Sequence, residues 1–164
     1  MTQTHTTYLS LGSNIPDRAA NLSRAVNCIA ESVGTVTKQS PIYETQSWGY
    51  SDEDYLNQTI EVETALTPFQ LLKTINAIES ALGRIRSGKG YEARTIDIDI
   101  LFYDNEILDT PQLTIPHPKI ALRRFVLTPL CDIAPEFLHP VIRKKAKELL
   151  KNCTDTLNVK LFQK

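Results

Sequence analysis

Two aspartates, Asp97 and Asp99, give the strongest chemical signal, because only one residue separates them within a predicted strand over residues 95–103. Side chains alternate between the faces of a strand, so both carboxylates are expected on one face, with Cα atoms about 6.6–6.8 Å apart. This spacing suits two carboxylates that converge on one metal ion or on a pair of ions. The opposite face is expected to carry the apolar residues of the strand, Ile96, Ile98, Ile100 and Phe102.

Positive charge gathers in two short stretches, although the chain has a net charge of −1. The first stretch directly precedes the aspartates in a glycine-containing segment and comprises Arg84, Arg86, Lys89 and Arg94. The second comprises Lys119, Arg123 and Arg124. The simpler interpretation is a solvated face on which arginines neutralise the aspartates. Carboxylates beside several cations are also what Mg²⁺ and phosphate oxygens require, so the combination favours phosphate chemistry.

Common phosphate-binding motifs do not account for these residues. The sequence lacks G-x-x-x-x-G-K-[ST], and its turn at Gly12 and Ser13 is not a dinucleotide-binding fingerprint. The H-R-D and D-F-G motifs of protein kinases are also missing. A bound nucleotide would therefore be held by a metal and by cationic side chains rather than by a glycine-rich loop.

The composition is that of a soluble globular protein, with 41% hydrophobic and 23% charged residues. A length of 164 residues suits one domain, 1–164, with a substantial core. No apolar run reaches the roughly 18 residues of a membrane span, and residues 1–7 lack a signal-peptide pattern, so a cytoplasmic location is expected. The net charge argues against a nucleic-acid partner, and the three cysteines are expected to be reduced.

Hydrophobic periodicity and turn residues predict an α+β fold. The helix with the clearest limits runs from Thr67 to Gly83, where Thr67, Pro68 and Gln70 form a capping-box pattern. A first helix is expected from Pro16 to Gly34, and later ones over residues 124–133 and 143–151. Strands are expected over residues 8–11, 35–43, 57–64, 95–103 and 157–162. Residues 84–94 are expected to form a mobile basic loop.

The order of these elements predicts the arrangement of the sheet. A β-α-β-β-α-β order is typical of a ferredoxin-like core with an antiparallel or mixed sheet. Helices are expected to flank the sheet, which gives three α/β/α layers.

Seven short stretches make the sequence similar to one enzyme family. They are residues 8–14 (YLSLGSN), 43–45 (YET), 54–57 (DYLN), 79–86 (ESALGRIR), 94–100 (RTIDIDI), 113–118 (LTIPHP) and 123–127 (RRFVL). In this order the sequence resembles the 6-hydroxymethyl-7,8-dihydropterin pyrophosphokinase family from Tyr8 to about Pro140. The resemblance implies transfer of diphosphate from ATP to the pterin hydroxymethyl group, which gives AMP and the pterin diphosphate.

The resemblance also implies roles in binding metal and phosphate. Asp97 and Asp99 would hold two Mg²⁺ ions that bridge the triphosphate, a role that suits the oxygen preference of Mg²⁺. Arg84 and Arg94 match phosphate-binding arginines that act in catalysis. Further ATP contacts are expected from Arg86, His117 and Arg123. An isolated histidine between prolines would more simply be a fixed surface residue.

Pterin and adenine contacts follow from the same correspondence. Tyr55 and Phe125 match a stacking pair, and Thr45 and Asn57 match polar contacts to the ring edge. Without the resemblance, the two aromatic residues would be read as core. The remaining matches to the ATP site are Leu72, Asn76, Ile100 and Thr114. Glu79 matches a residue near the nucleotide, without an assigned role.

Some positions depart from the family pattern. Tyr91 stands where tryptophan is common, Glu92 replaces a small residue, and Gly90 replaces a basic one. Gln46 and Trp48 stand where proline and an aliphatic residue are familiar. These departures put the rate and the fit of the ring in question, so a paralogue that acts on a related pterin is an alternative.

Two further readings belong to other classes of protein. An RNA-binding module could share the order of elements, although carboxylates on a central strand would repel phosphates without metal. A nucleotidyl- or glycosyltransferase could also use a D-x-D metal site. The group that accepts the proton of the attacking hydroxyl is open between a metal-bound carboxylate and water. A monomer is the expectation from the family.

Overall fold

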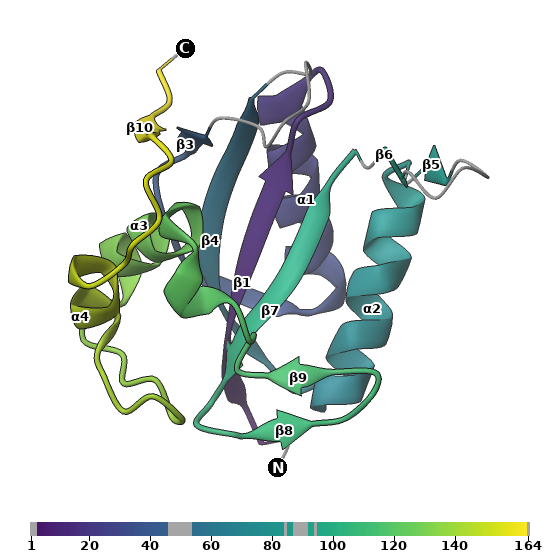
Figure 1. The fold of residues 1–164 in the computed structure, drawn as a ribbon. Coiled ribbons are helices and arrows are strands. Elements are labelled where there is room, and N and C mark those ends of the chain that lie inside the picture. The colour runs from purple at the N-terminus through teal and green to yellow at the C-terminus, as the bar shows by residue number, and fades with distance from the viewer. Residues whose placement is uncertain (1–2, 46–53, 84, 87–91, 94, 164) are drawn as a thin grey trace.

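The computed structural model describes residues 3–45, 54–83, 85–86, 92–93 and 95–163, and its elements are shown in Figure 1. The longer strands are β1 (His5–Ser13), β2 (Gly34–Gln39), β4 (Tyr55–Thr64) and β7 (Asp97–Tyr103). The short strands are β3 (Tyr43–Thr45), β5 (Ile85–Arg86), β6 (Glu92–Ala93), β8 (Leu108–Asp109), β9 (Thr114–Ile115) and β10 (Val159–Leu161). The helices are α1 (Arg18–Ser32), α2 (Pro68–Ala81), the 3₁₀ turn η1 (Ile120–Leu122), α3 (Arg124–Ile133) and α4 (Ala146–Lys151).

The main sheet is antiparallel and has β1 near its centre. Its hydrogen-bonded order is β10-β3-β4-β1-β7, and β2 also pairs with β4. The four long strands therefore lie side by side in the order β7-β1-β4-β2. Along the chain, α1 connects β1 to β2, and α2 lies between β4 and β7. This confirms the predicted α+β fold and its ferredoxin-like core.

Helices cover both faces of this sheet, so the fold has three layers (Figure 1). One core cluster joins the sheet to α1 and α2 through residues such as Leu9, Ile29 and Ile75. A second cluster joins the other face to α3 and α4 through residues such as Phe102 and Leu127. Within the described part of the chain, no helix combines the length and apolar character that crossing a bilayer requires.

Helix α2 begins where the capping-box pattern predicts. Gln70 N donates to Thr67 Oγ1 at 3.3 Å, and Thr67 N donates to Gln70 Oε1 at 2.9 Å. These bonds satisfy N–H groups that the first turn of a helix leaves unpaired. At the other end, Gly83 has φ 98°, a conformation that glycine adopts at little cost.

A β-bulge in the pairing of β1 and β7 interrupts the alternation of side chains between the two faces of the sheet near the end of β7. Tyr8 pairs with Phe102, whereas the next residue, Leu9, pairs with Ile100. Leu101 and Phe102 therefore both pack in the cluster under α3 and α4. The prediction that Phe102 shares a face with Ile100 is wrong, because strict alternation ends at the bulge.

Other boundaries also differ from the predictions. The strand predicted over residues 35–43 is two strands, β2 and β3, with Pro41 between them. The last predicted helix begins only at Ala146, because Arg143 has φ 64°, which a right-handed helix does not allow. Within the predicted basic loop, β5 and β6 form an antiparallel pair. The remaining loop positions, 84, 87–91 and 94, lie outside the described residues.

Candidate active site

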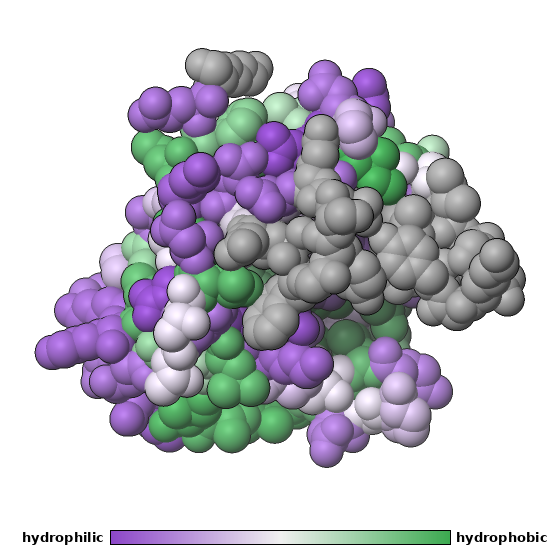
Figure 2. Space-filling view, turned by 45° about the horizontal axis from the view of Figure 1, so that its top comes forward, coloured by the Kyte–Doolittle hydropathy of each residue, from purple (hydrophilic) through white to green (hydrophobic). Residues whose placement is uncertain are grey.

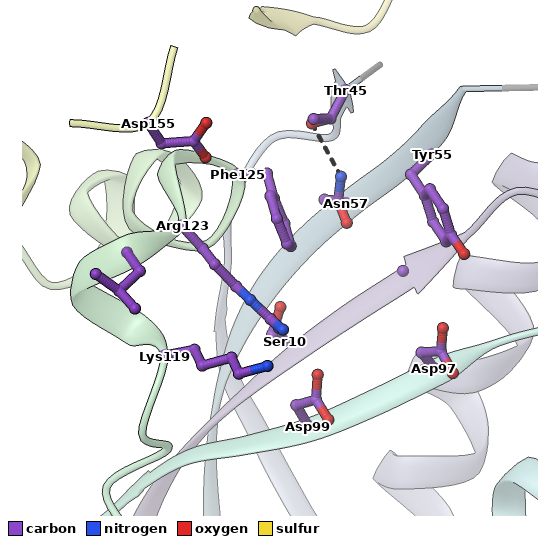
Figure 3. A pocket seen from close by; sticks show the side chains of 12 residues that line it. Ser10, Thr45, Tyr55, Asn57, Asp97, Asp99, Lys119, Arg123, Phe125 and Asp155 are labelled. Atoms are coloured by element: carbon purple, nitrogen blue, oxygen red, sulfur yellow. Dashed lines mark hydrogen bonds between the residues drawn. The ribbon is translucent and has the colours of Figure 1, made fainter. Parts of the chain in front are cut away.

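A cavity of about 580 Å³ opens on the face of the sheet that α3 covers (Figure 3). This volume is within the range of small-molecule binding sites. Its lining combines strand residues with residues after β9 and near the C-terminus. They are Ser10, Gly12, Thr45, Tyr55, Asn57, Asp97, Asp99, Lys119, Leu122, Arg123, Phe125 and Asp155. In the space-filling view, hydrophilic and hydrophobic residues are interspersed over the upper part of the molecule, and a patch of apolar residues lies at the bottom centre (Figure 2).

The cavity brings together many of the residues selected from the sequence. Asp97 and Asp99 lie along one edge, which we call the carboxylate side. The second group, which we call the aromatic side, comprises Thr45, Tyr55, Asn57 and Phe125. Arg123 also lines the cavity. Residues more than 70 positions apart in the sequence thus share one site.

The carboxylate side is fixed by the strand that carries it. Asp97 and Asp99 alternate with Ile98, which is only 6% exposed and belongs to the core under α1 and α2. This alternation sends both carboxylates to the opposite face, as predicted. On its inner edge β7 pairs with β1, where Gly12 faces Asp97 and Ser10 faces Asp99.

A buried glutamate holds the backbone between the two aspartates. β7 lies at the edge of the sheet, so its outward N–H groups need partners other than a neighbouring strand. Ile98 N donates to Glu79 Oε2 at 2.9 Å, and Glu79 on α2 is only 4% exposed. Glu79, which had no assigned role, therefore anchors the strand at the point where the carboxylates stand.

The donor set of this side suits a magnesium ion. Among the described residues, no group of three or more histidine, cysteine, aspartate or glutamate side chains could hold a metal. The chain offers two carboxylates instead, and Mg²⁺ is commonly bound by one or two carboxylates together with substrate phosphates and water. Asp97 and Asp99 thus fit an ion that binds together with a phosphate ligand.

On the aromatic side, a hydrogen bond orients two buried polar groups. Asn57 Nδ2 donates to Thr45 Oγ1 at 3.0 Å, and the two residues are 4% and 3% exposed. Gly12 leaves room beside them, because a Cβ there would lie 3.1 Å from Asn57 Oδ1. In the view of Figure 3, the rings of Phe125 and Tyr55 lie to either side of Asn57.

Cationic side chains extend into the cavity from the segment before α3. Arg123 and Lys119 both point toward the strands and Asp99 in Figure 3. The Arg123 guanidinium carbon also lies 5.6 Å from the centroid of the Phe125 ring, within the range of a cation–π contact. This segment therefore supplies positive charge opposite the two carboxylates.

His117 lies in the electrostatic field of these groups. Burial lowers its pKa, Arg123 and Lys119 lower it further, and the negative charge of Asp99 opposes them. The imidazole is therefore neutral at neutral pH. Its Nδ1 accepts a hydrogen bond from Lys119 N at 3.1 Å, which leaves the proton on Nε2. His117 can thus donate to an anionic ligand without carrying a full charge.

The other predicted ATP residues lie apart from this cavity. Ile100 is buried in the core, Leu72 packs half-buried against it, and Asn76 is exposed on α2. Thr114 is half-buried in β9. These assignments stay predictions.

Several predicted positions fall outside the described residues. They include Arg84 and Arg94, and the departures at Gln46, Trp48, Gly90 and Tyr91. Arg86 and Glu92 are described only as paired backbone in β5 and β6. The roles proposed for these side chains therefore depend on the sequence alone.

Sequence reasoning missed several residues that line the cavity. Gly12 and Lys119 had partial signals, in the glycine-containing turn and the second basic stretch. Ser10 lies within the first family-like stretch but had no assigned role, and Leu122 had no signal, because it follows an ordinary local pattern. Asp155 is the most distant from the predicted motifs, and only the tertiary fold brings it to the site.

Comparison with known proteins shows a consistent similarity. Residues 8–135 match the family model described as 7,8-dihydro-6-hydroxymethylpterin-pyrophosphokinase (HPPK). The 2-amino-4-hydroxy-6-hydroxymethyldihydropteridine pyrophosphokinase of Bacillus subtilis is 44% identical over 131 residues, which cover 79% of this chain and 78% of that protein. The protein of the same name from Aquifex aeolicus is 38% identical over 144 residues, 87% of this chain and 89% of that one.

A solved structure shares the fold. Wild-type Plasmodium falciparum HPPK-DHPS with STZ-DHP has a TM-score of 0.73 and 18% sequence identity. The match covers 91% of this chain but 43% of that chain, so this chain spans less than half of that protein.

Proposed function

The chain belongs to the 7,8-dihydro-6-hydroxymethylpterin-pyrophosphokinase family, a pyrophosphokinase of folate biosynthesis, and we propose that Asp97 and Asp99 make its reaction depend on magnesium. The enzyme transfers a diphosphate from ATP to the hydroxymethyl group of 6-hydroxymethyl-7,8-dihydropterin and releases AMP. One observation carries the metal assignment. Two carboxylates that project from alternate positions of β7 face cationic side chains across a single cavity.

Asp97 and Asp99 would together hold two Mg²⁺ ions, which offset the charge of the triphosphate and favour attack at phosphorus when bound. The chain itself contributes position and charge rather than a covalent intermediate. Glu79 keeps the two carboxylates in register by holding Ile98 N. Arg123 stabilises the charge that develops on the phosphates, and His117 donates its Nε2–H to a phosphate oxygen.

The aromatic side receives the pterin. Tyr55 and Phe125 contact the faces of the flat ring, and Thr45 and Asn57 bond to its polar edge. The Asn57 amide donates to Thr45, so its Oδ1 is set to accept from a ring amino group. The hydroxymethyl group would then point toward the carboxylate side of the same cavity.

The family correspondence supports the remaining contacts with ATP. Arg84, Arg86 and Arg94 would bind the phosphates. The adenosine part of ATP would lie near four residues outside the cavity lining, Leu72, Asn76, Ile100 and Thr114.

Three broader properties belong to the same proposal. The chain acts as one domain over residues 1–164, is cytoplasmic and is a monomer that needs no nucleic-acid or membrane partner. Light scattering on the purified chain tests the oligomeric state, where a mass near 18.5 kDa is expected.

Product analysis tests the reaction and its metal requirement. With Mg²⁺, ATP and 6-hydroxymethyl-7,8-dihydropterin, chromatography is expected to show one AMP for each pterin diphosphate. Asp97→Ala and Asp99→Ala should each abolish turnover while circular dichroism shows a retained fold. Release of pyrophosphate instead of AMP would reject the reaction, and full activity of either variant would reject the metal site.

A further inference from the structure

The segment after α4, residues 153–162, lies beyond the part of the chain that matches the family model. We call it the C-terminal strap. In Figure 1 it passes α3 and continues as β10 beside β3, so it connects two parts of the molecule that are distant in sequence. Both of these parts carry residues of the aromatic side.

At its first end, the strap holds the beginning of α3. Arg124 N donates to Asp155 Oδ2 at 3.1 Å, while Leu157 N donates to Asp155 Oδ1 at 3.0 Å. The N-cap of α3, Arg123, makes no side-chain capping bond of its own. Asp155 therefore caps this helix from a distance, and its negative charge suits the positive end of the helix dipole.

The side chain of Arg124 strengthens the same connection. Arg124 Nε donates to Asp155 O at 3.0 Å, and Arg124 Nη2 donates to Cys153 O at 3.0 Å. A guanidinium that binds two backbone carbonyls fixes both its own position and that of the strap. The residues on each side of Arg124 are Arg123 and Phe125, and both line the cavity together with Asp155 (Figure 3).

At its second end, the strap holds β3. Val159 pairs with Thr45 and Leu161 pairs with Tyr43, and Phe162 N donates to Ile42 O at 2.9 Å. A side-chain contact supports this pairing, since the Arg18 guanidinium carbon lies 5.6 Å from the centroid of the Phe162 ring. Thr45, the partner of Asn57, thus lies between the strap on one side and Tyr55 of β4 on the other, and the strap completes its support.

We propose that the C-terminal strap sets the separation of the Phe125 and Thr45 walls, and that Asp155 and Arg124 are positioning residues for pterin binding. This inference rests on the proposed function, because it takes the aromatic side as the pterin site. The carboxylate side does not depend on the strap, since β7 is held by β1 and by Glu79. The strap therefore acts mainly on pterin affinity. Nucleotide affinity depends on the strap only through Arg123, one of several cationic contacts with the phosphates, and changes much less.

Two variants weaken the contact between the strap and the beginning of α3, one by changing Asp155 and the other by changing Arg124. Asp155→Asn has one acceptor oxygen for two N–H donors, and Arg124→Gln loses the donors to Asp155 O and Cys153 O. Glu136→Gln is the matched control, because Glu136 is an exposed carboxylate that pairs with Lys145 and Lys147 outside the cavity. Calorimetry measures the Kd of 6-hydroxymethylpterin with a non-hydrolysable ATP analogue present, and separately the Kd of the analogue.

We expect each variant to raise the pterin Kd roughly tenfold, with the analogue Kd within about twofold of wild type. The double variant should match the larger single effect, because both changes remove one interaction. An unchanged pterin Kd would overturn the inference, as would equal losses of pterin and nucleotide affinity, including loss through failure to fold. AMP formation by the wild-type chain is measured in parallel: pterin binding without AMP rejects the reaction but not the strap.

Discussion

The two sides of the cavity are built in different ways. Asp97 and Asp99 stand on one strand, and their common direction follows from the burial of Ile98 between them. Thr45 and Phe125, in contrast, come from β3 and α3, which the C-terminal strap connects. The charged groups are thus positioned by a local pattern and the core. On the aromatic side, Tyr55 and Asn57 stand on β4, but Thr45 and Phe125 are positioned by contacts between distant segments, so the two sides should respond to different substitutions.

The largest loss of kcat among these variants is expected at Glu79, which connects the strand of the two aspartates to α2. Glu79→Ala leaves Ile98 N buried without its partner, which costs about 1–3 kcal/mol of stability and loosens the strand. We expect kcat to fall roughly 10–100-fold, as for other residues that orient metal ligands, with the pterin Kd within about twofold. Steady-state kinetics and calorimetry measure the two quantities.

Glu79→Gln is the matched control, because its side-chain oxygen can still accept from Ile98 N. It should retain a larger share of kcat than the alanine variant. If Glu79→Ala kept wild-type kcat, or lost pterin affinity as strongly as kcat, the two sides would not be independent.

A smaller effect is expected on the aromatic side. Gly12→Ala places a Cβ 3.1 Å from Asn57 Oδ1, which is tight enough to displace that side chain from Thr45. We expect the pterin Kd to rise about fivefold, which corresponds to about 1 kcal/mol. In an Asn57→Ala background the same substitution should have little further effect, because the crowded atom is gone. Equal effects in both backgrounds would reject this explanation.

The smallest effect is a loss of folding stability at acidic pH, caused by His139 in the part of the molecule that packs with α3 and α4. Burial lowers the pKa of His139 below its ordinary value near 6.5, and its Nδ1 accepts from Ile142 N at 3.0 Å. The unfolded chain therefore binds more protons than the folded one at mildly acidic pH. Stability is complete above about pH 6.5 and falls as the pH decreases toward the lowered pKa, by at most about 1.4 kcal/mol per pH unit for this group.

Urea unfolding at several pH values between 7.5 and 5 measures this dependence. His139→Asn can keep an acceptor near the Nδ1 position without titrating, so its stability should change less with pH. His117, whose pKa burial also lowers, contributes in the same direction and remains in both proteins. Equal slopes for the two proteins would show that His139 does not carry the effect.

The sequence predicted what local patterns determine. The alternation in β7 placed Asp97 and Asp99 on one face, and the capping box located α2. Phe102 was misplaced because the bulge at the pairing of β1 and β7 depends on the neighbouring strand. Asp155 could not be predicted, because its partner Arg124 is 31 positions away and no periodic pattern relates them. The resemblance to the family, rather than periodicity, selected Thr45, Tyr55, Asn57 and Phe125.

The most direct test of the central claim is a calorimetric titration of Mg²⁺ into the chain saturated with a non-hydrolysable ATP analogue. The wild-type chain is expected to take up two ions, beyond the binding of Mg²⁺ to the free analogue. Asp97→Asn and Asp99→Asn should each weaken that uptake by at least about tenfold, whereas Asp155→Asn should leave it unchanged. Wild-type stoichiometry and affinity in both aspartate variants would contradict the account.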